Sequence, residues 1–363
     1  MKEKEDSNSN KFIFEDEEED LDSLKKLDEH DMEEEVSSVI CLSDGRIAAL
    51  NEDGLLKIFS IKEDKFNLDI EEKLEAGTFL VEMRPYTLVT YCFGYEYIIK
   101  IEGNKIKQIK TCESIFNVTV YKIEKINDNQ IAQCSNNKVI EIIEFNESKN
   151  DEYQCIKKYF QINEDGSNDF KVNGLCLHPN VEVLTLFYQK EFNRLISGSR
   201  DKILRVWDLN ELSNKSSMED MAKIKPLFEI KSIDVCVGNT ISCYNDLIFT
   251  GGIGHINVLK KDNYEVIKSL NLDEKFKMQF DVFAVETFHE FGGLYEVVVV
   301  GVNQGGALMI FDNEEFMLYR TEPIHQGTVN NICKIKDSGL IATGSQDGYI
   351  KLFRYSDKKL ITI

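Results

Sequence analysis

The stretch Leu195-Ile-Ser-Gly-Ser-Arg-Asp-Lys-Ile-Leu-Arg-Val-Trp-Asp208 decides the fold of this chain. It places one apolar run that ends in small residues, and a second apolar run, on either side of a tight turn at Asp201. A second copy with the same layout reads Leu340-Ile-Ala-Thr-Gly-Ser-Gln-Asp-Gly-Tyr-Ile-Lys-Leu-Phe353. Short apolar runs around such a turn predict a pair of antiparallel strands. The chain therefore contains an internal repeat that is built on a β-hairpin.

Five weaker copies of this hairpin accompany the two strong ones. The seven turns fall near residues 53, 94, 136, 201, 253, 305 and 347, so neighbouring turns are about 41 to 65 residues apart. A repeat of roughly forty residues forms one blade of a β-propeller per copy. Seven blades are enough to close a ring. The sequence therefore predicts an all-β chain folded as a single seven-bladed β-propeller.

A parallel α/β sheet is the alternative, because it also produces strands that are apolar throughout, such as Val297–Val300. That architecture needs helical patterns of about 10–15 residues between its strands. Only Met218–Lys225 and, more weakly, Leu21–Leu27 have a helical pattern. Blades that cover each other's central strands explain the apolar runs without helices, which favours the propeller.

The two strong copies resemble WD40 repeats, and the resemblance extends over roughly residues 30–363. In that family a His before the first strand, a Ser or Thr on the second, an Asp in the turn and a Trp on the third form a series of hydrogen bonds. The matching positions are His178, Ser197, Asp201 and Trp207 in the fourth copy, and His325, Thr343 and Asp347 in the seventh, where Phe353 replaces Trp. A buried Asp is costly unless its oxygens accept hydrogen bonds. We therefore expect these two structural sets to stabilise their blades, whereas the other five copies lack most of the set.

The resemblance implies a non-catalytic scaffold for protein–protein interactions within a multi-protein assembly, with other proteins as its partners. It also implies two alternatives. Some family members read histone tails or other peptides at the mouth of the central channel, and a few hydrolyse a methyl ester in the diphthamide pathway. No residue here singles out the ester hydrolase. Substrate receptors of ubiquitin ligases carry an Arg two residues after a Trp-Asp pair, and here Asn210 stands at that position.

The domain boundaries are predicted from the repeats and from an acidic N-terminus. Residues 1–35 contain 16 acidic and 5 basic residues, and the whole chain has a net charge of −21. We expect an acidic tail over residues 1–29, which either solubilises the chain or docks on a basic partner. An excess of negative charge makes nucleic acid an improbable partner, because binding to its backbone depends on clustered Lys and Arg. The predicted propeller covers residues 30–363, with blades near 30–76, 77–114, 115–170, 171–228, 229–277, 278–322 and 323–363.

The sequence contains no pattern for a metal site, a cofactor or a catalytic centre. Its nine cysteines are scattered singly without a C-x-x-C pair, so neither a zinc site nor a disulfide framework is expected. Gly251-Gly-Ile-Gly254 precedes an apolar strand, whereas a phosphate-binding loop precedes a helix. No apolar run approaches the ~18 residues of a membrane helix, and the charged N-terminus is unlike a signal peptide. We therefore expect a non-enzymatic protein of the cytoplasm or nucleus, without a cofactor or a membrane partner.

Two features leave alternatives open. Residues 144–177 and 210–227 are insertions between copies, and they either carry recognition or are tolerated expansions of surface loops. The outer strand of the seventh blade comes either from Lys358–Ile363 or from Lys11–Phe14. We expect the C-terminal segment to supply it, because that segment directly follows the blade.

Overall fold

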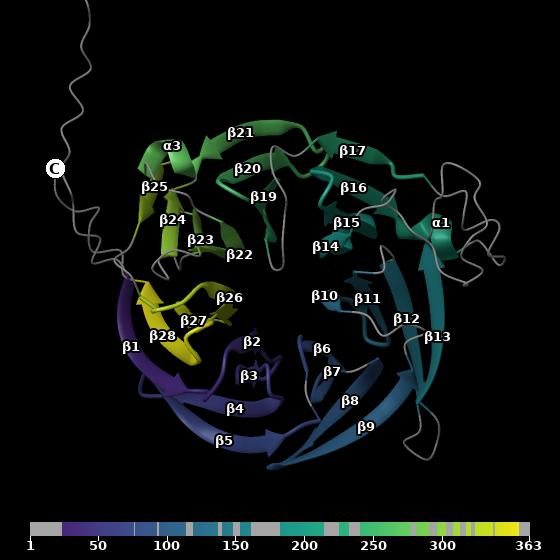
Figure 1. Cartoon of the computed structure of the whole chain (residues 1–363), viewed down its shortest axis with the longest axis vertical. Coiled ribbons are helices and arrows are strands. Elements are labelled where there is room, and N and C mark those ends of the chain that lie inside the picture. Colours follow the sequence, from purple (N-terminus) through teal and green to yellow (C-terminus); the bar gives the residue numbers. More distant parts are fainter. Residues whose placement is uncertain are drawn as a thin grey trace, which may run out of the picture.

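Seven four-stranded antiparallel sheets surround a central channel in the computed structural model of the chain (Figure 1). Each sheet is one blade, and its strands are called a to d from the channel to the rim. The predicted all-β propeller is therefore confirmed, with seven blades in the described part of the chain. The structure describes residues 24–355 without 76, 93, 114–118, 137–139, 148–152, 161–181, 214–224, 232–239, 277–280, 290–295, 303–307, 313–316, 321–323 and 337.

The first four blades contain β2 to β17 in chain order. The first blade consists of β2 (Val36–Cys41), β3 (Ile47–Asn51), β4 (Leu55–Lys62) and β5 (Lys65–Lys73). The second consists of β6 (Val81–Arg84), β7 (Thr87–Cys92), β8 (Tyr95–Glu102) and β9 (Lys105–Glu113). The third consists of β10 (Val120–Asn127), β11 (Gln130–Ser135), β12 (Ile140–Glu147) and β13 (Tyr153–Phe160). The fourth consists of β14 (Val183–Gln189), the 3-10 turn η1 (Lys190–Phe192), β15 (Arg194–Ser199), β16 (Ile203–Asp208), the short helix α1 (Leu209–Ser213) and β17 (Phe228–Lys231).

The remaining three blades complete the ring. The fifth consists of β18 (Ile241–Tyr244), β19 (Leu247–Gly251), β20 (His255–Lys260) and β21 (Val266–Asn271), followed by the short helix α3 (Leu272–Phe276). The sixth consists of β22 (Val282–His289), β23 (Glu296–Val302), β24 (Leu308–Asp312) and β25 (Met317–Arg320). The seventh consists of β26 (Val329–Ile335), β27 (Leu340–Ser345), β28 (Tyr349–Tyr355) and β1 (Leu24–Asp31).

The strand that closes the ring is β1, which differs from the sequence-based prediction. β1 pairs with β28 from Leu24–Tyr355 to Asp31–Tyr349 and so occupies the edge that Lys358–Ile363 was predicted to take. The expected C-terminal closure is therefore wrong, and the alternative segment Lys11–Phe14 lies outside the described residues. The predicted helix over Leu21–Leu27 is also wrong from Leu24 onward. The predicted boundary between tail and propeller at residue 29 falls inside this strand.

Apolar side chains between neighbouring blades form the core. Between the seventh and first blades the buried cluster combines Met32, Val36, Phe59, Ile350 and Leu352, all with 0% exposure. Gly344 of β27 belongs to this contact, because a Cβ there would lie 2.6 Å from Val39 and 2.7 Å from Val36. A larger residue at position 344 would therefore push the two blades apart.

Candidate functional site

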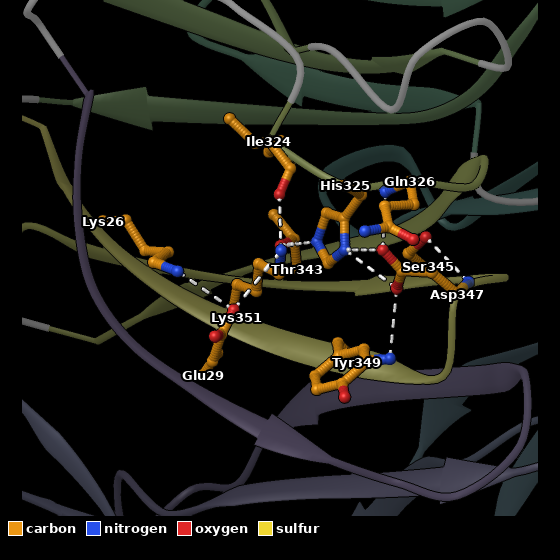
Figure 2. Close-up of polar contacts among 10 residues, drawn as sticks. All are labelled: Lys26, Glu29, Ile324, His325, Gln326, Thr343, Ser345, Asp347, Tyr349 and Lys351. Atoms are coloured by element: carbon orange, nitrogen blue, oxygen red, sulfur yellow. Dashed lines mark hydrogen bonds and ion pairs between the residues drawn. The ribbon is translucent and has the colours of Figure 1, made fainter.

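The seventh blade contains a buried polar network centred on His325 (Figure 2). His325 Nδ1 lies 3.0 Å from both carboxylate oxygens of Asp347, and Nε2 lies 2.8 Å from Thr343 Oγ1. With the proton on Nδ1, the imidazole donates to Asp347 and accepts from the Thr343 hydroxyl. The backbone N–H groups of Gln326 and Tyr349 also donate to Asp347, at 2.7 and 3.1 Å. The structure thus brings together the three residues that the sequence places in this set.

Burial and hydrogen bonding fix the protonation states in this network. Burial lowers the pKa of His325, and the Asp347 carboxylate only partly opposes that effect. Burial alone would raise the pKa of Asp347, but the hydrogen bonds from His325, Gln326 and Tyr349 hold it well below its ordinary value. A neutral imidazole beside an ionised carboxylate is therefore the folded-state arrangement.

On the third strand of this blade, Phe353 takes the position that Trp207 has in the fourth blade, and Lys351 lies on the same strand. Phe353 lies opposite Ile341, as Trp207 lies opposite Leu195 in the fourth blade, and it is 1% exposed. Lys351 lies opposite Thr343, and its Nζ donates to the Ile324 carbonyl at 2.8 Å. The same Nζ lies 3.4 Å from Glu29 of β1, so this lysine ties the closing strand to the blade (Figure 2).

The fourth blade contains the Trp and Ser of the predicted set in contact. Trp207 Nε1 donates to Ser197 Oγ at 2.9 Å, which joins two of the predicted residues. Asp201 accepts from the backbone N–H of Ile203 at 3.0 Å and from Arg205 at 2.7 Å. His178, the fourth predicted residue, lies outside the described part of the chain. The family pattern does not include Arg205. Arg205 lies opposite Ser197 in the fourth blade, just as Lys351 lies opposite Thr343 in the seventh.

Replacement of Asp201 tests this arrangement. Asp201→Ala should lower the free energy of unfolding by about 1–3 kcal/mol, because Arg205 and the part-buried N–H of Ile203 lose a charged acceptor. Asn136→Ala provides the matched control, since Asn136 occupies the equivalent turn of the third blade and accepts one exposed bond from the Thr119 N–H. Urea unfolding of both variants gives the comparison, and equal losses would contradict the structural role of Asp201.

Other blades contain polar groups that the sequence reading missed. Asn51, which is 1% exposed, donates to the Met32 carbonyl and accepts from the Leu55 N–H, each at 2.7 Å. In the third blade the Gln133 amide donates to Glu96 at 3.0 Å and to Glu141 at 2.6 Å. Asn51 and Gln133 are both polar residues on the second strand of a blade, which a search limited to the family pattern does not detect.

The central channel forms a cavity of about 350 Å³ that is lined by the innermost strands. Its charged side chains are Lys122, Glu124, Glu286 and Lys334. Burial raises the pKa of both glutamates, and the nearby lysines oppose this shift. Glu124 accepts from the Tyr188 N–H at 3.2 Å and lies 3.8 Å from Lys122. The channel charges are therefore balanced locally. Within the described residues, no group of three His, Cys, Asp or Glu could hold a metal ion.

The described residues on the two faces of the ring differ in charge. The b–c turns and the connections between blades lie on one face, which we call the acidic face; the a–b and c–d connections lie on the opposite face. Outside strands, the acidic face has twelve described acidic residues and three basic ones: Glu33, Glu34, Glu35, Glu52, Asp53, Glu75, Glu182, Asp201, Asp273, Glu274, Asp281 and Asp347, with Arg200, Lys202 and Lys275. The opposite face has nine and five: Asp44, Glu63, Asp64, Asp128, Glu191, Glu211, Asp246, Asp262 and Glu265, with Arg46, Lys190, Lys225, Lys261 and Lys336.

The acidic residues concentrate where the first blade meets the seventh. The N–H of Glu52 donates to the Glu35 carbonyl at 2.9 Å, which brings the two acidic turns together. Burial, and then repulsion from Glu35, Asp53 and Glu34, raise the pKa of Glu52. Like charges are thus crowded at this part of the acidic face.

Comparisons with known proteins agree with this architecture. A family model described as "WD domain, G-beta repeat" matches residues 155–208 and 317–354, which include the two strong copies. No curated protein matches the chain in sequence. A chain from a solved structure titled "Crystal Structure of Mitotic Checkpoint Complex" is similar in fold, with a TM-score of 0.66 and 13% identity over 96% of this chain and 100% of that one. None of the helices in the described ranges has the length and apolar character needed to span a bilayer. With two repeats matched by the family model and seven blades in one ring, the chain is a β-propeller of the WD40 type.

Proposed function

We propose that this chain is a non-catalytic scaffold that binds other proteins within a multi-protein assembly, and that it docks a basic partner on its acidic face. The observation that carries the proposal is the charge difference between the described residues of the two faces, twelve acidic to three basic residues against nine to five. Complementary charge steers association and selects the partner. A cation that arrives near Glu52 would also relieve the repulsion from Glu35, Asp53 and Glu34.

Two further observations support a binding role. The polar residues in the centres of the fourth and seventh blades bond to one another, which gives them a structural explanation. The fold is similar to that of a chain in a checkpoint complex, although a likeness at 13% identity concerns the fold alone. A partner that presents a Lys- and Arg-rich peptide, as in the peptide-reader alternative, would use the same acidic face.

Affinity purification of the tagged protein from the cells that produce it, followed by mass spectrometry, tests the proposal. We expect a stable set of partners, with the direct partner carrying a basic surface. A triple variant, Glu34→Gln, Glu52→Gln and Asp53→Asn, should reduce recovery of that partner about three- to tenfold, because each exposed charge contributes a few tenths of a kcal/mol or more. Recovery should also fall as salt is raised.

The control removes the same number of charges from the opposite face, with Glu211→Gln, Asp246→Asn and Asp262→Asn. This variant should retain the partner. Equal loss with both triple variants, or recovery that is insensitive to salt, would contradict docking on the acidic face. Absence of any reproducible partner would contradict the scaffold function itself.

A further inference from the structure

A cluster of aromatic rings surrounds Arg194 on the opposite face, between the fourth and fifth blades. The guanidinium carbon lies 5.1 Å from the centre of the Phe192 ring and 5.8 Å from those of Phe228 and Tyr264. Arg194 also donates to the Tyr264 hydroxyl at 3.1 Å, and that hydroxyl donates to Gln189 at 2.6 Å. The guanidinium is therefore held in a defined orientation by stacking and by one hydrogen bond.

Among the described residues Arg194 has no carboxylate partner, unlike the other described arginines. The remaining five with described side chains each pair with Asp or Glu: Arg46 with Asp44, Arg84 with Glu147, Arg200 with Glu182, Arg205 with Asp201 and Glu229, and Arg354 with Asp64. Asp208 lies opposite Arg194 in the sheet, but its Oδ1 accepts from Asn210. In a chain with 64 acidic and 43 basic residues, this unpaired guanidinium is an exception.

The surface around Arg194 is apolar and exposed. Phe192 is 39% exposed, Leu227 41% and Phe228 36%. Glu191, next to Phe192 in the same turn, lies 3.0 Å from Lys261. The Arg194 patch, defined as Phe192, Arg194, Leu227, Phe228 and Tyr264, thus combines the residue types that dominate protein interfaces with one uncompensated positive charge.

We propose that the Arg194 patch binds the chain's own N-terminal segment Phe12-Ile-Phe-Glu-Asp16, with the apolar side chains on the rings and a carboxylate on the guanidinium. Phe12-Ile-Phe14 is the only run of three apolar residues in the first 23, and the acidic run Glu15–Asp20 follows it directly. A planar guanidinium can bind a carboxylate through two parallel hydrogen bonds. β1 already occupies the edge of the seventh blade, which leaves the segment available for another surface.

β1 begins on the same face as the Arg194 patch. Leu24 pairs with Tyr355 at the end of β28, and this end lies on the opposite face, as does the turn that contains Phe192. β1 and β17 belong to different sides of the ring (Figure 1). Ten extended residues span at most about 35 Å, whereas a blade of four strands is about 15 Å wide. The patch lies between the fourth and fifth blades and β1 in the seventh, so the proposed contact requires the stretch from Phe14 to Leu24 to be close to fully extended.

Photo-crosslinking in the full-length protein tests the contact. With photoreactive benzoylphenylalanine in place of Phe12, we expect crosslinks to peptides that contain Phe192 or Phe228, within a single chain on a denaturing gel. Arg194→Gln should reduce the yield of these crosslinks about tenfold, because a charge-assisted pair is lost. Arg194→Lys should give an intermediate yield, since the charge remains and the planar stacking is lost.

Arg46→Gln is the matched control, because Arg46 is on the same face and already pairs with Asp44. It should leave the crosslink yield unchanged. Thermal melting of each variant verifies that the propeller remains folded. Crosslinks to other blades, crosslinks between chains, or equal yields from wild type and Arg194→Gln would each overturn the proposal.

Discussion

Deletion of residues 1–31 should lower the free energy of unfolding by at least about 3 kcal/mol, because it exposes the edge of β28 and uncovers apolar surface. Seven residues of β1 pair with β28, and the Met32 N–H that follows donates to the Gly348 carbonyl at 2.7 Å. β1 also joins the first blade, since Asp28 accepts from the Phe66 N–H at 2.8 Å and the Asp31 carbonyl accepts from Lys57 at 3.1 Å. Its loss therefore opens the ring as well as one blade.

Deletion of residues 358–363 is the control for this prediction. The sequence predicts that those residues close the ring, so the two truncations distinguish closure by β1 from closure by Lys358–Ile363. Urea unfolding at neutral pH should show a lower midpoint only for the N-terminal deletion. A comparable loss from the C-terminal deletion would mean that Lys358–Ile363, and not β1, completes the seventh blade.

The β1 segment also shows why part of the fold was predictable and part was not. Turn spacing and apolar runs predict the seven hairpins, because each hairpin is a local structure with its own turn residues. Ring closure joins residues more than 300 positions apart, so no local pattern reports it. In β1 the register shifts between Lys26 and Asp28, which leaves Leu27 as an extra residue in the strand. Because of this bulge, apolar residues in β1 do not recur at every second position, and their spacing in the sequence resembles that of a helix.

The candidate sites also divide into those that the sequence could locate and those that it could not. The set His325, Thr343 and Asp347 could be located because its residues match a known pattern at fixed spacing. The Arg194 patch could not, since its side chains come from β15, β17 and the turns of two blades. The acidic face could be predicted only in part. The sequence shows the excess of negative charge, but the strand order is needed to assign each acidic turn to one face of the ring.

The stability of the propeller should decrease as the pH falls from about 7 toward 5, and His325 should account for part of that decrease. The pKa of His325 is lowered in the folded state, so below the ordinary value of about 6.5 the unfolded chain takes up a proton that the folded chain does not. Proton uptake by the unfolded chain favours unfolding. Asp347 acts in the same direction at lower pH, because its depressed pKa means that stability is lost as the unfolded carboxyl becomes protonated below about 4.

His325→Gln separates this contribution from the rest of the chain. At pH 7.5 the variant should be less stable by about 1–3 kcal/mol, because Asp347 and Thr343 lose a buried partner. Between pH 7.5 and 5.0, however, it should lose less stability than the wild type, since the group that resists protonation is gone. His255→Gln is the control, because His255 lies near the surface of the fifth blade and bonds to the Ile253 carbonyl. Urea midpoints at both pH values give the result, and an identical pH dependence in wild type and His325→Gln would show that the His325 imidazole is not held neutral by burial in the folded protein.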